Sequence, residues 1–130
     1  MAEPRRHQWW VLAGLVAVFM GASQGLSWWA QERAGDLARQ HARPGDITMY
    51  STTNCLYCAK ARRWLDEHQV PWRECNIDLS KACQQTFDAQ GAPGTPLMLV
   101  KGRWHLGFDA EWLGEALQAT PLNAGRPAPP

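Results

Sequence analysis

The chain has 130 residues, a formal net charge of +1 and eight tryptophans. That length fits one small domain with terminal additions. Residues 46–119 carry seven Lys or Arg and nine Asp or Glu, a net charge of −2, which excludes the strongly basic character of nucleic-acid-binding domains. We therefore expect a single domain that does not bind nucleic acid. We also expect the protein to be a monomer.

The N-terminal segment is apolar and uncharged. Residues 9–30 span 22 residues without a charged side chain and carry a tryptophan pair near each end. A membrane helix needs about 20 apolar residues, and tryptophans are enriched at both membrane interfaces. We therefore predict residues 1–30 to be a membrane anchor. The alternative is a secretory signal peptide, with its apolar stretch at 11–20 and small residues for cleavage at 21–23.

Basic residues flank the apolar segment on both sides, so the positive-inside rule is nearly balanced. They are Arg5 and Arg6 before it, and Arg33, Arg39 and Arg43 after it. A short basic tail before an apolar segment is the usual export pattern, so we expect the domain on the exported, periplasmic or extracytoplasmic side. Residues 31–45 are expected to form a polar tether, helical in part over Glu32–Gln40 and ending at Pro44-Gly45.

Two cysteines separated by two residues lie at a predicted strand-to-helix junction. The strand is expected over Ile47–Ser51 and the helix over Leu56–His68, with Cys55 at its N-terminus and Cys58 one turn further in. Unpaired N–H groups and the helix dipole at this position favour the thiolate of Cys55. A thiolate attacks disulfides, and Cys58 can then resolve the mixed disulfide. This pattern predicts dithiol redox chemistry.

The alternatives for this pair are half of a zinc site or a plain structural disulfide. A zinc site needs a second ligand pair, and the spacing of Cys75 and Cys83 does not fit one. We expect no metal. Cys75 and Cys83 are either free, unrelated small apolar residues, or a second disulfide, or a relay of electrons to Cys55 and Cys58. The disulfide would stabilise the domain by about 2–3 kcal/mol on the chain-entropy model.

The rest of the predicted domain consists of two more helices and three more strands. Periodicity and capping residues place strands at 72–77, 97–100 and 104–106, the last two as a hairpin through residues 101–103. Ser80 is expected to cap a helix that runs to Gln90 and ends at Gly91, and Asp109 to cap the last helix. The tail at 120–130 contains four prolines and is expected to be disordered.

These segments together resemble a glutaredoxin, a family of the thioredoxin-like superfamily. The resemblance covers about residues 46–118 and rests on Ile47–Ser51, Cys55–Cys58, Asn76–Asp78, Gly94–Pro96 and Gly107–Asp109. It implies an α/β fold of βαβαββα order with a four-stranded mixed sheet over residues 46–119. It also implies a cis Thr95–Pro96 bond beside the cysteines, with the Thr95 backbone pairing to the substrate.

The resemblance implies the site residues as well. Cys55 and Cys58 would be catalytic, and the substrate-binding residues would be Tyr57, Thr95, Pro96, Gly107, Phe108 and Asp109. Leu56 stands where most dithiol glutaredoxins have proline, and Gly107-Phe108 replaces a frequent Gly-Gly. Gly107-Phe108-Asp109 looks closer to the small glutaredoxin-like redoxins often served by thioredoxin reductase.

The predicted function is membrane-anchored thiol-disulfide exchange on protein disulfides or glutathione-mixed disulfides. No resident cofactor is expected, with glutathione as a co-substrate in one version of this function. One alternative is a dimer that binds a [2Fe-2S] cluster between its two protomers through Cys55 and glutathione. Leu56, in place of the usual proline, leaves this alternative open. Another is a non-catalytic module whose cysteines are structural.

Overall fold

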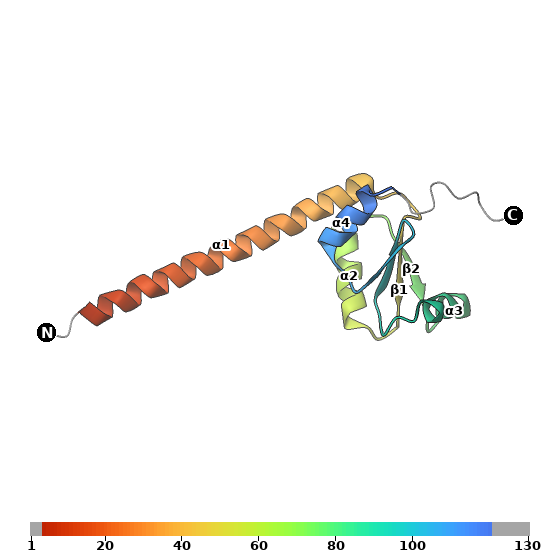
Figure 1. Cartoon of the computed structure of the whole chain (residues 1–130), viewed down its shortest axis with the longest axis horizontal. Helices are drawn as coiled ribbons and strands as arrows, with labels where there is room; N and C mark the ends of the chain where they lie inside the picture. Colours follow the sequence, from red (N-terminus) through yellow and green to blue (C-terminus); the bar gives the residue numbers. More distant parts are fainter. Residues whose placement is uncertain (1–3, 121–130) are drawn as a thin grey trace. The chain divides into compact units, whose positions relative to one another are not determined.

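The computed structural model describes residues 4–120. Its elements in chain order are α1 (Pro4–His41), β1 (Ile47–Ser51), α2 (Leu56–Glu67), β2 (Arg73–Asn76), α3 (Lys81–Gln90), β3 (Leu97–Val100), β4 (Arg103–Leu106) and α4 (Ala110–Gln118), shown in Figure 1. The chain divides into two compact units between Glu32 and Arg33. The predicted disordered tail falls on residues 121–130, apart from Thr120, and lies outside the described residues.

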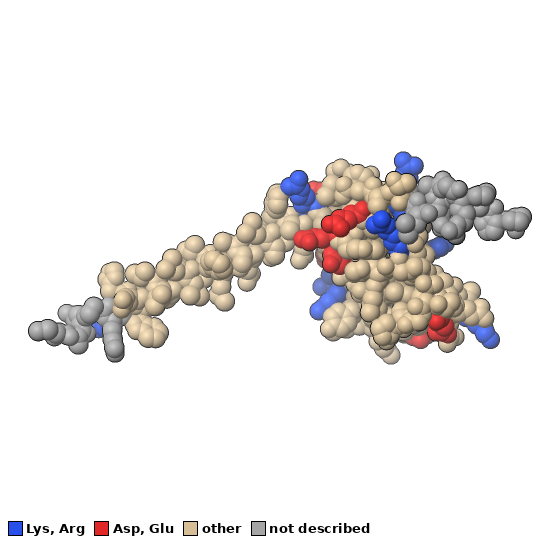
Figure 2. All heavy atoms as spheres, in the orientation of Figure 1, with Lys and Arg blue, Asp and Glu red and all other residues tan. Residues whose placement is uncertain are grey.

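The first unit consists of the N-terminal part of α1. Within residues 4–120, α1 is the one helix whose length and composition would allow it to cross a membrane, and a signal sequence has the same properties. Its large apolar side chains are exposed, among them Trp10, Phe19 and Trp28. Figure 2 shows the long middle part of this helix without a charged side chain on the visible face. The choice between anchor and signal peptide therefore stays a prediction.

The second unit has a thioredoxin-like fold. Its four strands are ordered β2-β1-β3-β4; β1 and β2 are parallel, and the other two pairs are antiparallel. Every residue of β1 is buried, as expected for a central strand covered on both faces. The predicted mixed α/β sheet is confirmed.

Helices α2 and α4 cover one face of the sheet (Figure 1). Leu65 of α2 and Leu113 and Leu117 of α4 are each no more than 1% exposed, and they pack with Ile47, Met49, Met98 and Val100 from the sheet. The predicted capping residues are in place: Ser80 begins α3, Gly91 ends it with a φ of 64°, and Asp109 begins α4. A left-handed residue after a helix favours glycine, which has no Cβ to clash.

The segment between the apolar stretch and the domain differs from the expected tether. Helix α1 continues to His41, and Ala34 and Ala38 are buried, Ala38 within the domain core. A Cβ placed on Gly35 would lie 1.9 Å from Cδ2 of His68. The last turns of α1 thus pack on the domain, and its compact unit begins at Arg33 rather than at residue 46. Small residues at these positions allow this close approach, although they give only a weak hydrophobic signal in a sequence.

Helix α3 is attached to the domain differently from α2 and α4. None of its side chains is buried. A disulfide joins Cys83, in its first turn, to Cys75 on the edge strand β2, with the two Cα atoms 5.5 Å apart. Of the alternatives left open for these two cysteines, the structure has the disulfide.

Candidate functional site

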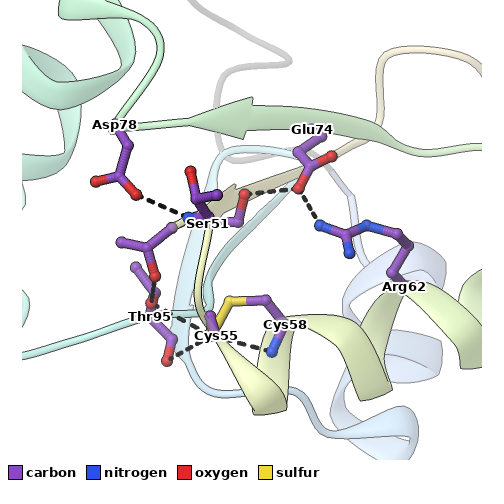
Figure 3. Close-up of a disulfide and its surroundings, with 9 residues drawn as sticks. Ser51, Cys55, Cys58, Arg62, Glu74, Asp78 and Thr95 are labelled. Atoms are coloured by element: carbon purple, nitrogen blue, oxygen red, sulfur yellow. Dashed lines mark hydrogen bonds and ion pairs between the residues drawn. A yellow bond between two sulfur atoms is a disulfide. The ribbon is translucent and has the colours of Figure 1, made fainter.

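The cysteine pair lies where β1 gives way to α2 (Figure 3). Cys55 is the N-cap residue of α2, with extended backbone angles, and its sulfur accepts the backbone N–H of Cys58 at 3.1 Å. The two sulfurs are joined in a disulfide. In the reduced protein the same N–H and the positive end of the helix dipole would stabilise a Cys55 thiolate.

The two cysteines differ in their access to solvent. Cys58 is only 1% exposed and belongs to the hydrophobic core, whereas Cys55 is half-buried. A reagent from solvent can therefore reach the sulfur of Cys55 more easily than that of Cys58. The two thiols of the reduced protein would therefore differ in their accessibility to a reactant from solvent.

Thr95 also contacts the sulfur of Cys55, in addition to the backbone N–H of Cys58. Its hydroxyl donates to Cys55 Sγ at 3.4 Å, and its carbonyl oxygen lies 3.7 Å from the same sulfur. The Thr95–Pro96 bond is cis, as the resemblance implied, and Pro96 is buried. The second hydrogen-bond partner of the Thr95 hydroxyl is Thr52 Oγ1 at 3.2 Å. Thus the Thr95 segment and the loop before Cys55 meet at one sulfur atom.

The other predicted substrate-binding residues lie in two different settings. Tyr57 is 68% exposed beside the cysteines, and Leu56 is equally exposed. The backbone N–H of Gly107 donates to the Pro96 carbonyl at 2.8 Å, which places this turn next to the cis bond. Phe108 packs against the core, and its ring lies 5.2 Å from that of Trp64. The Asp109 carboxylate caps α4 by accepting the N–H groups of Glu111 and Trp112, which gives it a structural role.

A polar network lies beside the site at the end of β1. The buried Ser51 hydroxyl donates to Glu74 at 2.7 Å, and Arg62 of α2 forms an ion pair with the same carboxylate (Figure 3). Burial acts to raise the pKa of Glu74, but the hydrogen bonds from Ser51 and Arg62 and the charge of Arg62 outweigh it, so the pKa lies below its usual value. Glu74 is therefore ionised at neutral pH, and Arg62 has a partner within the domain.

Sequence reasoning missed one residue of this site. Asp78 follows β2, and its carboxylate accepts the backbone N–H of Thr53 at 2.7 Å, two residues before Cys55. The motif Asn76-Ile77-Asp78 was part of the resemblance, but nothing in one sequence pairs an aspartate with a loop 25 residues away. Within residues 4–120, no three His, Cys, Asp or Glu side chains come together as metal ligands.

Comparison with known families supports the redox assignment. The family model for glutaredoxin matches residues 47–105, which include both cysteines and Thr95–Pro96. The matched part of the chain is therefore similar to glutaredoxins. It runs from the start of β1 into β4 and covers neither α1 nor α4.

Individual relatives share short segments with the chain. The glutaredoxin-like protein NrdH of Lactococcus lactis is 44% identical over 32 residues, which are 25% of this chain and 44% of that protein. The global transcriptional regulator Spx of Listeria innocua is 48% identical over 31 residues, 24% of each chain. The chain therefore spans less than half the length of these relatives. The solved NrdH-redoxin of Escherichia coli is 22% identical, with a TM-score of 0.47, and the match covers 64% of this chain and 97% of that one.

Proposed function

We propose that this protein is a glutaredoxin-like thiol-disulfide oxidoreductase in which Cys55 is the attacking thiol and Cys58 the resolving thiol. The observation that carries this proposal is the asymmetry of the pair. Cys55 caps α2, is half-buried, and has hydrogen-bond donors from Cys58 and Thr95 on its sulfur, while Cys58 is buried. A purely structural disulfide has no need of a hydroxyl donor aimed at one of its two sulfurs.

The reaction follows from this arrangement in two displacements. The Cys55 thiolate attacks one sulfur of a substrate disulfide, which forms a mixed disulfide and releases the first substrate thiolate. The Cys58 thiolate then attacks the Cys55 sulfur, which forms the intramolecular disulfide and releases the second substrate thiolate. Two electrons pass from the dithiol to the substrate, and an external thiol reductant restores the dithiol. The same steps run in reverse when the substrate is a dithiol.

We propose a disulfide-containing protein or a glutathione-mixed disulfide as the substrate. Exposed Leu56 and Tyr57 beside Cys55 offer apolar contact to a polypeptide. The exposed Lys60 lies 5.6 Å from the Tyr57 ring and adds a positive charge that would favour an acidic neighbour of the substrate cysteine. The Thr95 backbone, next to the sulfur, would pair with the substrate chain.

The order of thiol reactivity tests the assigned roles. In the reduced full-length protein in detergent, Cys55 is expected to alkylate faster than Cys58 and to react at lower pH than a free cysteine, because its thiolate is stabilised and accessible. Mass-mapped alkylation from pH 5 to 9 measures both rates. Dithiol-driven reduction of insulin and of a glutathione-mixed disulfide then compares the two substrate classes. Faster alkylation of Cys58, or no exchange with either substrate, would contradict the proposal.

We further propose that residues 9–30 anchor the protein in a membrane, with the redox domain on the exported side. The length, absence of charge and terminal tryptophan pairs of this segment support the anchor. The Cys75–Cys83 disulfide supports the exported side, because such bonds persist in oxidising compartments.

Membrane extraction distinguishes the anchor from a removed signal peptide. The full-length protein is expected to remain in the membrane pellet after carbonate treatment and to keep its N-terminus at or near Met1. A reporter fused after Pro130 should be active only on the exported side. A soluble mature protein that starts near Gln24 would show a cleaved signal instead, and a reporter active in the cytoplasm would contradict the orientation.

A further inference from the structure

The contact between Asp78 and Thr53 joins two segments that are distant in sequence. The Asp78 carboxylate lies beyond the end of β2, and the Thr53 N–H that it accepts belongs to the loop between β1 and Cys55 (Figure 3). This hydrogen bond is 2.7 Å long, is exposed to solvent and has a carboxylate oxygen as its acceptor. Asp78 thus holds the loop at Thr53 that precedes Cys55.

Asp78 is itself held in place by the turn that contains it. Its backbone N–H donates to the Asn76 side-chain oxygen at 2.9 Å, and the N–H of Ser80 donates to the Asn76 carbonyl at 3.0 Å. On the other side, the Ile77 N–H donates to the Ser51 carbonyl at 2.9 Å. The turn at 76–80 therefore lies directly against the end of β1.

The Cys75–Cys83 disulfide closes the loop that contains this turn. Cys75 lies in β2 opposite Tyr50 of β1, and Cys83 lies in the first turn of α3. Because α3 contributes no buried side chain, apolar packing does little to hold the far end of the loop. The disulfide does so covalently, and Asp78 lies between its two cysteines.

The loop that Asp78 holds is linked to the sulfur of Cys55 by two hydrogen bonds through Thr95. Thr52, next to Thr53, contacts the Thr95 hydroxyl, which donates to Cys55 Sγ. A shift of the Thr53 backbone would move both Thr52 and Cys55 relative to Thr95. The hydrogen bonds that stabilise the Cys55 thiolate then depend on where this loop lies.

We propose that Asp78 is a positioning residue for Cys55 and that the Cys75–Cys83 disulfide keeps it in position. This inference rests on the proposed function, because it takes Cys55 to be the attacking thiol. The loss of the Asp78 contact is expected to weaken thiolate stabilisation at Cys55. Reduction of the Cys75–Cys83 disulfide by a thiol reductant is therefore expected to lower the reactivity of Cys55.

The test compares variants at Asp78 by mass-mapped alkylation of Cys55 across pH, on the full-length protein in detergent. Asp78→Ala is expected to slow alkylation of Cys55 at pH 7 about three- to tenfold, which corresponds to the loss of roughly one hydrogen bond to its sulfur. The curve of alkylation rate against pH should move to higher pH. Asp78→Asn keeps an oxygen acceptor for the Thr53 N–H and is expected to stay within about twofold of wild type. If Asp78 acted only through its negative charge, both variants would move the curve to lower pH, which would overturn the proposal.

A double variant tests the part played by the disulfide. Cys75→Ser/Cys83→Ser is expected to slow Cys55 alkylation, and its combination with Asp78→Ala should slow it no further than Asp78→Ala alone. Full additivity would mean that the disulfide does not act through Asp78. If Asp78→Ala does not fold, the double variant still tests the part assigned to the disulfide, because unchanged alkylation of Cys55 in it would overturn that part. In the samples that retain Cys75 and Cys83, alkylation of Cys55 is measured only on chains whose mass shows an intact Cys75–Cys83 bond.

Asp46 supplies the matched control. Its carboxylate also accepts a backbone N–H, that of Arg43 at 2.9 Å, but it lies at the opposite end of β1. Asp46→Ala should leave the alkylation curve of Cys55 unchanged. A wild-type protein without a fast Cys55 would end the proposed function; a fast Cys55 that responds equally to the Asp78→Ala and Asp46→Ala changes would end only this inference.

Discussion

Replacement of Cys58 by serine is expected to stop the reaction at a covalent complex between Cys55 and the substrate. The first displacement needs only Cys55, whereas release of the substrate needs the buried thiol one turn further along α2. Cys55→Ser should reduce exchange to the rate measured without protein, because the remaining thiol of the pair, Cys58, is buried and not accessible to a substrate disulfide. Non-reducing electrophoresis with mass mapping detects the trapped complex, and dithiol-driven insulin reduction measures turnover.

The Cys75→Ser/Cys83→Ser variant is the control for these changes. It should turn over substrate with no more than the moderate loss proposed above and should trap no complex. Turnover by the Cys55→Ser protein, or a complex that forms through Cys58, would reverse the assigned roles.

Replacement of Gly35 by alanine is expected to destabilise the domain by about 1–3 kcal/mol, the usual cost of overpacking. The added methyl group would lie 1.9 Å from His68 Cδ2. The His68 ring has little freedom to move away, since its Nδ1 lies 2.8 Å from the Trp64 carbonyl and the ring stacks on Trp64 at 4.2 Å. Urea titration of the full-length protein in detergent, followed by circular dichroism, measures the loss.

Gly114→Ala is the matched control for this prediction. Gly114 is also a buried helical glycine, in α4, but a Cβ there would meet nothing within 4 Å. Alanine is the better helix former by about 1 kcal/mol, so this variant should be neutral or stabilising. His68→Ala should restore part of the stability lost by Gly35→Ala, because it removes the ring that clashes. Equal stability of the Gly35→Ala and wild-type proteins would show that α1 does not pack closely here.

Local patterns in the sequence predicted most of the domain. The alternation of apolar segments with Ser80, Gly91 and Asp109 placed the elements to within about two residues, because capping and turn chemistry depend on adjacent residues. Cys55 and Cys58 were recognisable for the same reason: their spacing and their helix-terminal position are both local features.

Contacts between distant segments could not be predicted in this way. Ala34, Gly35 and Ala38 carry little hydrophobic signal, so the sequence predicts a tether where the last turns of α1 pack on the domain. The pairing of Asp78 with Thr53 depends on the parallel register of β1 and β2, which no local pattern specifies. Both features lie at places where the fold brings together segments that the sequence keeps apart.

The burial of Ala34 and Ala38 has a consequence for the mature form of this protein. A cut anywhere from Gly35 to Pro44 would separate a part of the domain's own core from the rest. A cut near Gln24 would leave every docked residue on the domain side. A form that keeps the N-terminal segment and a form cut near Gln24 would thus carry the same packed domain, so cleavage would change where the protein is located without altering the packing around Cys55.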